Sequence, residues 1–161
     1  NNDVDSPLKS FAATLSVPKE IAADAPLAVT GYAQVGISGV AKVQVRVCRK
    51  GEEPAGDPNF TSAPWLDARI LAPPVPGQWG GDIPDGSPPP GTLGFDAEGR
   101  PQSWPMRLSK VHWAVLLPGL PAGEYTLRSR TVDDHGQAQP MPRPFRKSGH
   151  AAIEPVAIKV N

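Results

Sequence analysis

The sequence contains a single cysteine and no excess of charge of either sign. Cys48 alone cannot form an internal disulfide, and it cannot build a thiolate cluster around a metal. Lys and Arg number 16, and Asp and Glu also number 16, so the formal net charge is zero. A neutral chain has no overall field that would attract it to nucleic acid or to an anionic membrane. We therefore expect partners recognised by local surface, and neither nucleic acid nor a membrane among them.

Long apolar runs and helical periodicity are missing as well. No apolar run approaches the roughly twenty residues that cross a bilayer, and residues 1–10 lack the pattern of a signal peptide. No window of useful length has apolar residues three and four positions apart, and prolines interrupt the places where a helix could be tried. The 161 residues are enough for one domain with one core. We predict a single all-β domain over residues 1–161.

Alternation of apolar and polar residues predicts about seven short strands. The candidate strands are 11–17, 27–35, 41–47, 65–71, 111–117, 124–132 and 153–160. The second and third, joined through Gly36 and Gly39, are predicted to pair as a hairpin. In the third strand, residues 41, 43, 45 and 47 are expected on the core face, with Lys42 on the other face. Seven antiparallel strands with turn signals between them predict an immunoglobulin-like β-sandwich, and Tyr125 stands where such sandwiches place a tyrosine.

Residues 72–105 differ from the rest of the chain. They contain nine prolines and seven glycines, so backbone donors are missing and no strand can persist. We predict a long irregular insertion here, in which Trp79, Phe95 and Trp104 can lie against the sandwich or against a neighbour. Loops of this length serve either partner binding or only surface coverage, and the sequence leaves both open.

Three segments, in order, resemble the dimerisation domain of sulfite oxidase-type molybdopterin oxidoreductases. The first is Gly31-Tyr-Ala-Gln-Val-Gly-Ile-Ser-Gly-Val-Ala-Lys-Val-Gln-Val-Arg-Val47, a glycine-alanine strand, a glycine turn and a valine-rich strand. The second, residues 120–140, has a turn, a strand with arginines and the ending Asp134-His135-Gly136 to Gln139-Pro140. The third is the closing strand at 153–160. The chain departs from the family at residues 48–64 and 145–150, and the 72–105 insertion has no counterpart in it.

The resemblance implies a non-catalytic C-terminal domain that pairs two subunits. In the family, the molybdenum-molybdopterin cofactor and its cysteine ligand belong to a preceding catalytic domain. A homodimer, contact with that catalytic domain of the same parent chain, and an exported or periplasmic location are what the resemblance implies here. Since the chain begins with Asn1 rather than Met, we expect it to be a piece of a longer protein. No catalytic residue is carried over, because no position matches the family's catalytic motifs.

The remaining residues with reactive side chains allow few functional hypotheses. Cys48 falls in phase with the polar face of its strand, which suggests an accessible thiol, although a lone cysteine is more often inert. Asp133, Asp134 and His135 have metal-ligand chemistry, but Asp and Gly at a strand end favour a tight turn. A local positive patch before the last strand, at Arg143, Arg146, Lys147 and His150, is a possible interface or anion-facing surface.

Two other function classes stay open at this point. One is a free-standing fibronectin-like adhesion or carbohydrate-binding module, with stacking faces for sugars at Trp65, Trp79, Trp104 and Trp113. The other is a hydrolase or redox enzyme that uses Cys48, or Asp133 with His135. The chain has no phosphate-binding glycine loop, no Gly-x-Ser-x-Gly elbow and no His-Glu-x-x-His motif, so the enzyme is the weakest of the hypotheses.

Overall fold

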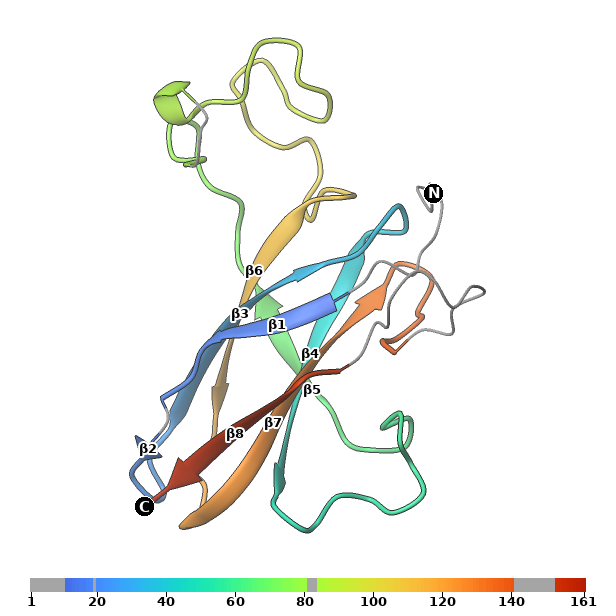
Figure 1. Cartoon of the computed structure of the whole chain (residues 1–161). Helices are drawn as coiled ribbons and strands as arrows, with labels where there is room; N and C mark the ends of the chain where they lie inside the picture. The colour runs from blue at the N-terminus through green and yellow to red at the C-terminus, as the bar shows by residue number, and fades with distance from the viewer. Residues whose placement is uncertain (1–10, 19, 81–83, 141–152) are drawn as a thin grey trace.

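The computed structural model describes residues 11–18, 20–80, 84–140 and 153–161, and this part of the chain is built from strands without an α-helix (Figure 1). The strands are β1 (Phe11–Ser16), β2 (Glu20–Ile21), β3 (Leu27–Gln34), β4 (Val40–Arg49), β5 (Leu66–Ile70), β6 (Lys110–Leu117), β7 (Gly123–Asp133) and β8 (Pro155–Val160). A short 3-10 turn, η2 (Pro84–Gly86), lies between β5 and β6. The all-β prediction is confirmed, and each of the seven predicted runs contains a strand. The two-residue β2 was not predicted. No helix among the described residues is long and apolar enough to cross a membrane.

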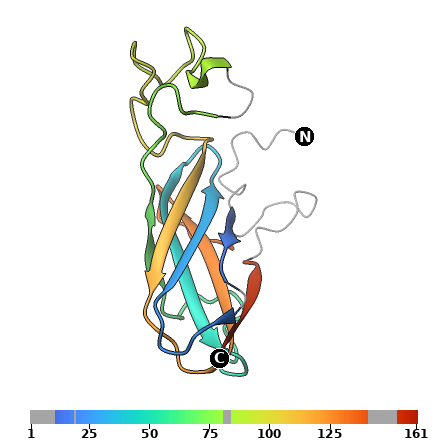
Figure 2. The ribbon, with the colours of Figure 1, turned by 90° about the vertical axis from the view of Figure 1, so that its left-hand side faces the viewer.

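The strands form one continuous hydrogen-bonded series in the order β1-β3-β6-β5-β4-β7-β8-β2. All neighbours are antiparallel except β2 and β8, which run parallel. The short β5 pairs with β6 through Arg69 and Ile70, and with β4 opposite residues 43–45. It therefore joins two groups of strands, β1-β3-β6 and β4-β7-β8-β2. Because β1 also packs near β7, the series wraps around a common core in a barrel-like manner (Figure 2).

The predicted hairpin of the second and third strands is wrong. β3 pairs with β1 and β6, whereas β4 pairs with β5 and β7, so the two consecutive strands lie in different groups. The turn between them, closed by a hydrogen bond from Gly39 N to Gly36 O (3.1 Å), carries the chain from one group to the other. Gly39 has a φ of 81°, which residues other than glycine rarely adopt. Alternation identified both strands correctly but could not identify their neighbours.

The core fills the space between the two groups of strands. Its fully buried side chains come from β3, β4, β6 and β7 and include Val29, Val43, Val45, Val111, Trp113 and Leu127. Trp113 Nε1 donates to Tyr32 O (3.1 Å), so the largest core side chain has its polar atom satisfied. The inward phase predicted for β4 holds for Val43 and Val45. It fails for Ala41, which is exposed because a register shift between Val40 and Lys42 turns Val40 inward instead.

A tyrosine fixes the corner between β6 and β7. Tyr125 lies near the start of β7 and is buried, and its Oη donates to Pro121 O (2.8 Å). The same corner packs against the connection from β2 to β3, where Asp24 N donates to Leu120 O (2.9 Å). A Cβ on Gly119 would lie 2.2 Å from Asp24 O, so this close approach requires glycine.

Two long connections leave the strands at opposite ends of the molecule. Residues 50–65, between β4 and β5, lie at one end, and the excursion of residues 71–109, between β5 and β6, projects from the other (Figure 1). The excursion departs and returns at neighbouring strands, where Leu71 N donates to His112 O (2.8 Å). Both connections are therefore additions to a complete set of strands.

Candidate functional site

The outer face of β4 and β7 carries three arginines. The register sets Arg46 directly opposite Arg128 and Gln44 directly opposite Arg130. These residues alternate with buried side chains such as Val45, so they project away from the core. Like charges directly opposite one another destabilise a strand pair, so this face needs compensating contacts.

Two aromatic rings of the 50–65 connection supply such contacts. The Arg128 guanidinium lies 4.6 Å from the centroid of the Phe60 ring, and the Arg46 guanidinium lies 5.9 Å from the same ring. Arg130 lies 4.2 Å from the centroid of the Trp65 ring. Phe60 and Trp65 meet edge to face with centroids 6.5 Å apart. Each arginine therefore lies within the range at which a cation is attracted to an aromatic face.

Asp57 holds the 50–65 connection in shape. Its Oδ1 accepts from Thr61 N (2.8 Å) and Thr61 Oγ1 (2.9 Å), and its Oδ2 accepts from Ser62 N (2.9 Å) and Ser62 Oγ (2.8 Å). These bonds, led by the backbone N–H of Thr61, hold the pKa of the Asp57 carboxyl far below its ordinary value. The ionised carboxylate is thus the form that this turn stabilises.

The backbone of Phe60 is strained. Its φ is 54°, a value that bulky residues rarely adopt. Its carbonyl oxygen accepts from Trp65 Nε1 (3.1 Å) and from Arg130 Nη1 (3.5 Å), which keeps the residue in place. Strain of this kind persists only where the surroundings determine the conformation, and it occurs often at ligand sites.

The three arginines differ in their polar partners. Arg128 Nη1 forms an ion pair with Glu53 Oε1 (2.5 Å), and Arg130 Nε donates to Gln44 Oε1 (2.9 Å). Burial lowers the pKa of Arg130 below its ordinary value. Arg46 is only 9% exposed, and its Nε and Nη1 are buried with no hydrogen-bond partner among the residues that the structure describes. Arg46 is therefore a buried cation without a carboxylate.

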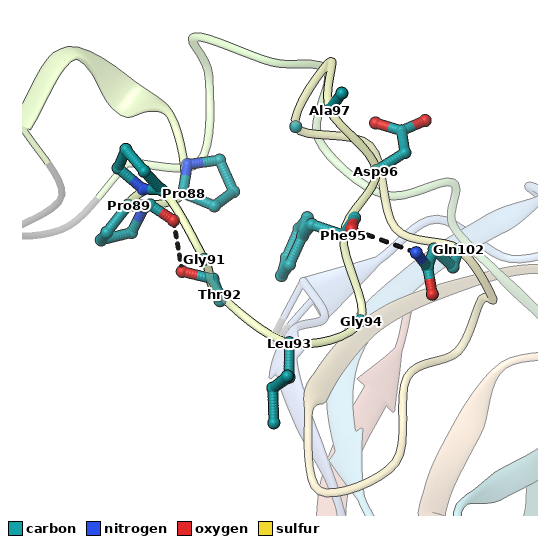
Figure 3. Close-up of a pocket in the computed structure, with 12 residues that line it drawn as sticks. Pro88, Pro89, Gly91, Thr92, Leu93, Gly94, Phe95, Asp96, Ala97 and Gln102 are labelled. Atoms are coloured by element: carbon teal, nitrogen blue, oxygen red, sulfur yellow. Dashed lines mark hydrogen bonds between the residues drawn. The ribbon is translucent and has the colours of Figure 1, made fainter.

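The excursion between β5 and β6 contains its own aromatic cluster and an open pocket. Trp79 meets Phe95 and Trp104 edge to face, with centroids 5.1 Å and 6.3 Å apart, and Trp104 Nε1 donates to Leu71 O (2.8 Å). Beside this cluster lies a pocket of about 590 Å³ (Figure 3). Its lining residues are Pro88, Pro89, Pro90, Gly91, Thr92, Leu93, Gly94, Phe95, Asp96, Ala97, Gly99 and Gln102.

The polar side chains that line this pocket form hydrogen bonds with the backbone of the same loop. Gln102 Nε2 donates to Phe95 O (3.2 Å), as Figure 3 shows. Asp96 Oδ1 accepts from Glu98 N (3.0 Å) and Arg100 N (2.8 Å), so one oxygen of the pocket's only carboxylate closes a turn. The pocket therefore brings together no pair of groups that could act as acid and base on a substrate.

Cys48 is not accessible, contrary to the expectation from its phase in the strand. It is 8% exposed, and its Sγ donates to Glu52 O (3.2 Å). The thiol faces outward from β4, but the start of the 50–65 connection folds back over it. A buried thiol with a backbone acceptor behaves as a small packing side chain.

The Asp133 segment is a turn, as its sequence suggests. Asp133 Oδ1 accepts from His135 N (3.0 Å) and Gln137 N (2.8 Å), and Gly136 has a φ of 78°. His135 is exposed, with Nδ1 3.7 Å from Asp133 Oδ2. Within the described ranges, no group of three or more His, Cys, Asp or Glu could hold a metal ion.

The predicted positive patch precedes the last strand in the sequence. Arg143, Arg146, Lys147 and His150 all lie outside the described residues. The patch stays a prediction.

The tryptophans offer few stacking faces. Trp113 is fully buried in the core, so the hypothesis that it stacks on a sugar is wrong. Trp65 lies against Arg130, and Trp79 and Trp104 lie against each other. Each of these three partly buried rings therefore has at least one contact within the chain.

The arginine-aromatic face was not predicted as a site. The sequence does show a signal for it, since Arg128 and Arg130 alternate with core residues and Arg46 does so on another strand. What the sequence cannot show is that Phe60 and Trp65, which come from a separate connection, cover these side chains.

No protein-family model matches the sequence, and no curated protein matches it. Among solved structures, one match is the chain described as "AvmM Catalyzes Macrocyclization in Alchivemycin A Biosynthesis", at 11% sequence identity and a TM-score of 0.41. The match covers 95% of this chain and 89% of the other. A likeness at this level carries no inference about function.

Proposed function

We propose that this chain is a non-catalytic assembly domain with an immunoglobulin-like fold, and that it pairs two subunits of a sulfite oxidase-type molybdopterin oxidoreductase. The fold part of the proposal is supported by three features. Consecutive strands β3 and β4 cross between the two groups, β2 runs parallel to β8, and Tyr125 closes the corner before β7. A tyrosine that hydrogen-bonds to the backbone a few residues upstream at this corner is typical of immunoglobulin-like sandwiches.

The segments that resemble the oxidoreductase family support the proposal through their position. Residues 31–47 span the second half of β3, the glycine turn and most of β4, and residues 120–140 span the corner, β7 and the Asp133 turn. The third segment, residues 153–160, contains β8. The resemblance therefore falls on the structural elements β3, β4, β7 and β8 rather than on scattered positions, and it leaves out β5 and β6.

The described residues do not fit a molybdopterin cofactor. The only thiol, on Cys48, is buried and donates to a backbone carbonyl. The pocket in the excursion presents prolines, one phenyl ring and a carboxylate that caps a turn. In our proposal, the cofactor belongs to another part of the parent enzyme, and this chain contributes no reacting group.

The outer face of β3 and β6 is the observation on which the assembly role rests. The register sets Ala28 opposite Leu116 and Thr30 opposite Ala114, so these side chains share one face. Leu116 is 70% exposed, and the only Lys, Arg, Asp or Glu on the paired part of this face is Lys110, at one end. Arg69 of β5 borders this face, opposite Ala114. A surface with small and apolar side chains and with charge only at Lys110 and Arg69 suits contact between two identical subunits across a two-fold axis.

Sedimentation equilibrium of the parent protein tests this role. We expect a dimer, and we expect Leu116→Arg to weaken it by at least about tenfold, because like charges would meet across the axis. Leu93→Arg makes the same chemical change at a residue that is 90% exposed in the excursion, and it should leave the dimer intact. A strictly monomeric parent would reject the assembly role, and an unchanged dimer in Leu116→Arg would reject this surface.

The carbohydrate-binding alternative has less support. A sugar platform needs an exposed aromatic face. Trp113 lacks one, and the rings of Trp79 and Trp104 pack on each other.

A further inference from the structure

We propose that the outer face of β4 and β7 is a binding site for an oxyanion, in which Arg46 and Arg128 hold the ligand and Phe60 is its cover. This inference is separate from the assembly role, since it concerns a different face of the chain. The ligand group is a carboxylate or a phosphate.

The charges on this face do not balance through direct contacts. Glu53 is the one carboxylate in the described part of the chain that forms an ion pair with any of the three arginines, through Arg128, and Asp57 attracts Arg130 only through its charge. Asp67 forms an ion pair with Lys42 through Oδ2 (3.0 Å from Nζ), and its Oδ1 accepts a hydrogen bond from Gln44 Nε2 (2.8 Å). The nearby Asp57 is committed to four hydrogen bonds within its own turn. One buried guanidinium, that of Arg46, is left without a counter-charge.

A buried cation without a partner is costly, and the cost falls if an anion binds beside it. Arg46 is more than nine-tenths buried, yet Nε and Nη1 have no acceptor within the described residues. A guanidinium presents its N–H groups as a planar fork that matches two oxygens of a carboxylate or phosphate. Arg46 and Arg128 face each other across neighbouring strands, so one oxyanion between them could contact both and would cancel their repulsion.

Phe60 occupies the place that such a ligand would need. Its ring lies over both Arg128 and Arg46, at 4.6 Å and 5.9 Å. The ring attracts these cations, but it offers no oxygen that could accept a hydrogen bond from Arg46 Nε or Nη1. The residue also has a φ of 54°, and backbone strain of this kind occurs often at ligand sites.

Calorimetric titration of the 161-residue chain tests the site. The probes are inorganic phosphate and a hexaglutamate peptide, each at an ionic strength held constant with NaCl. We expect saturable binding of at least one probe and a loss of at least tenfold in affinity for Arg46→Gln. Lys42→Gln is the matched control: it removes a cation from the same face of β4, at a side chain that is 57% exposed and paired with Asp67, and it should bind as the unchanged chain does.

Phe60→Ala provides a second, independent variant. If the ring is the cover, its removal opens the site and strengthens binding several-fold, and this variant keeps the proposal testable if Arg46→Gln does not fold. Binding of phosphate alone assigns a phosphate ligand, binding of the peptide alone assigns an acidic protein segment, and binding of both assigns oxyanions in general. The proposal is overturned if neither probe binds, if Arg46→Gln and Lys42→Gln lose affinity equally, or if Phe60→Ala weakens binding. The dimer measurement does not depend on these results.

Discussion

Shortening Val45 to alanine removes two methyl groups from the centre of the core. Val45 is fully buried in β4, opposite Ser129 on one side and Leu66 on the other. The two methyl groups account for about 1.6 kcal/mol of lost transfer energy at ~0.8 kcal/mol each. The space they leave adds about 1 kcal/mol, because strands held by ladders on both sides collapse only partly. We expect Val45→Ala to lower the free energy of unfolding by about 2–3 kcal/mol.

Urea unfolding followed by tryptophan fluorescence measures this loss, with Lys42→Ala as the control. Lys42 lies on the opposite face of the same strand and forms an exposed ion pair with Asp67, a contact worth only about 0.2–1 kcal/mol. Thermal unfolding should agree, since about 2–4 °C in Tm corresponds to 1 kcal/mol for a domain of this size. Similar small losses in both variants would refute the assignment of the inner and outer faces of β4.

Two further predictions concern the connections between strands. Tyr125→Phe should destabilise the fold by about 1 kcal/mol in urea unfolding, because Pro121 O loses its donor while the ring stays packed; no change would show that the corner does not depend on this bond. Asp57→Asn should destabilise the 50–65 connection at about pH 7, where the carboxylate accepts from Thr61 and Ser62. Because the folded-state pKa of Asp57 lies below its ordinary 3.8, this contribution is present above about pH 4 and is lost as the pH falls further. The hydrogen-exchange rate of the Thr61 amide should therefore differ between the unchanged chain and Asp57→Asn at about pH 7, and the two rates should converge as the pH falls. A difference in rate that does not depend on pH would contradict a role for the ionised carboxylate.

The local part of the fold could be predicted from the sequence. Each predicted run contains a strand because alternation of apolar residues reports burial directly, as at Val43 and Val45. The Asp133 turn was predictable because it depends on the Asp133 side chain and on Gly136, which lie within four residues of each other in the sequence.

The errors arise where the outcome depends on residues far apart in the chain. β3 and β4 are adjacent in sequence, and nothing local distinguishes a hairpin from a crossing between groups of strands. Arg46 and Cys48 are buried because the 50–65 connection folds back over the outer face of β4. Periodicity assigns those positions to the polar face correctly, but it does not show that this face is covered.

The 71–109 excursion is joined to the strands through two stems that sit side by side. Since the entropy of closing a loop grows slowly, a doubling of its length costs only about 0.6 kcal/mol. The β5–β6 junction can therefore accept inserts of very different size, provided that they keep Trp104, which packs against the core. An engineered variant of this chain can therefore carry a foreign loop at the same point.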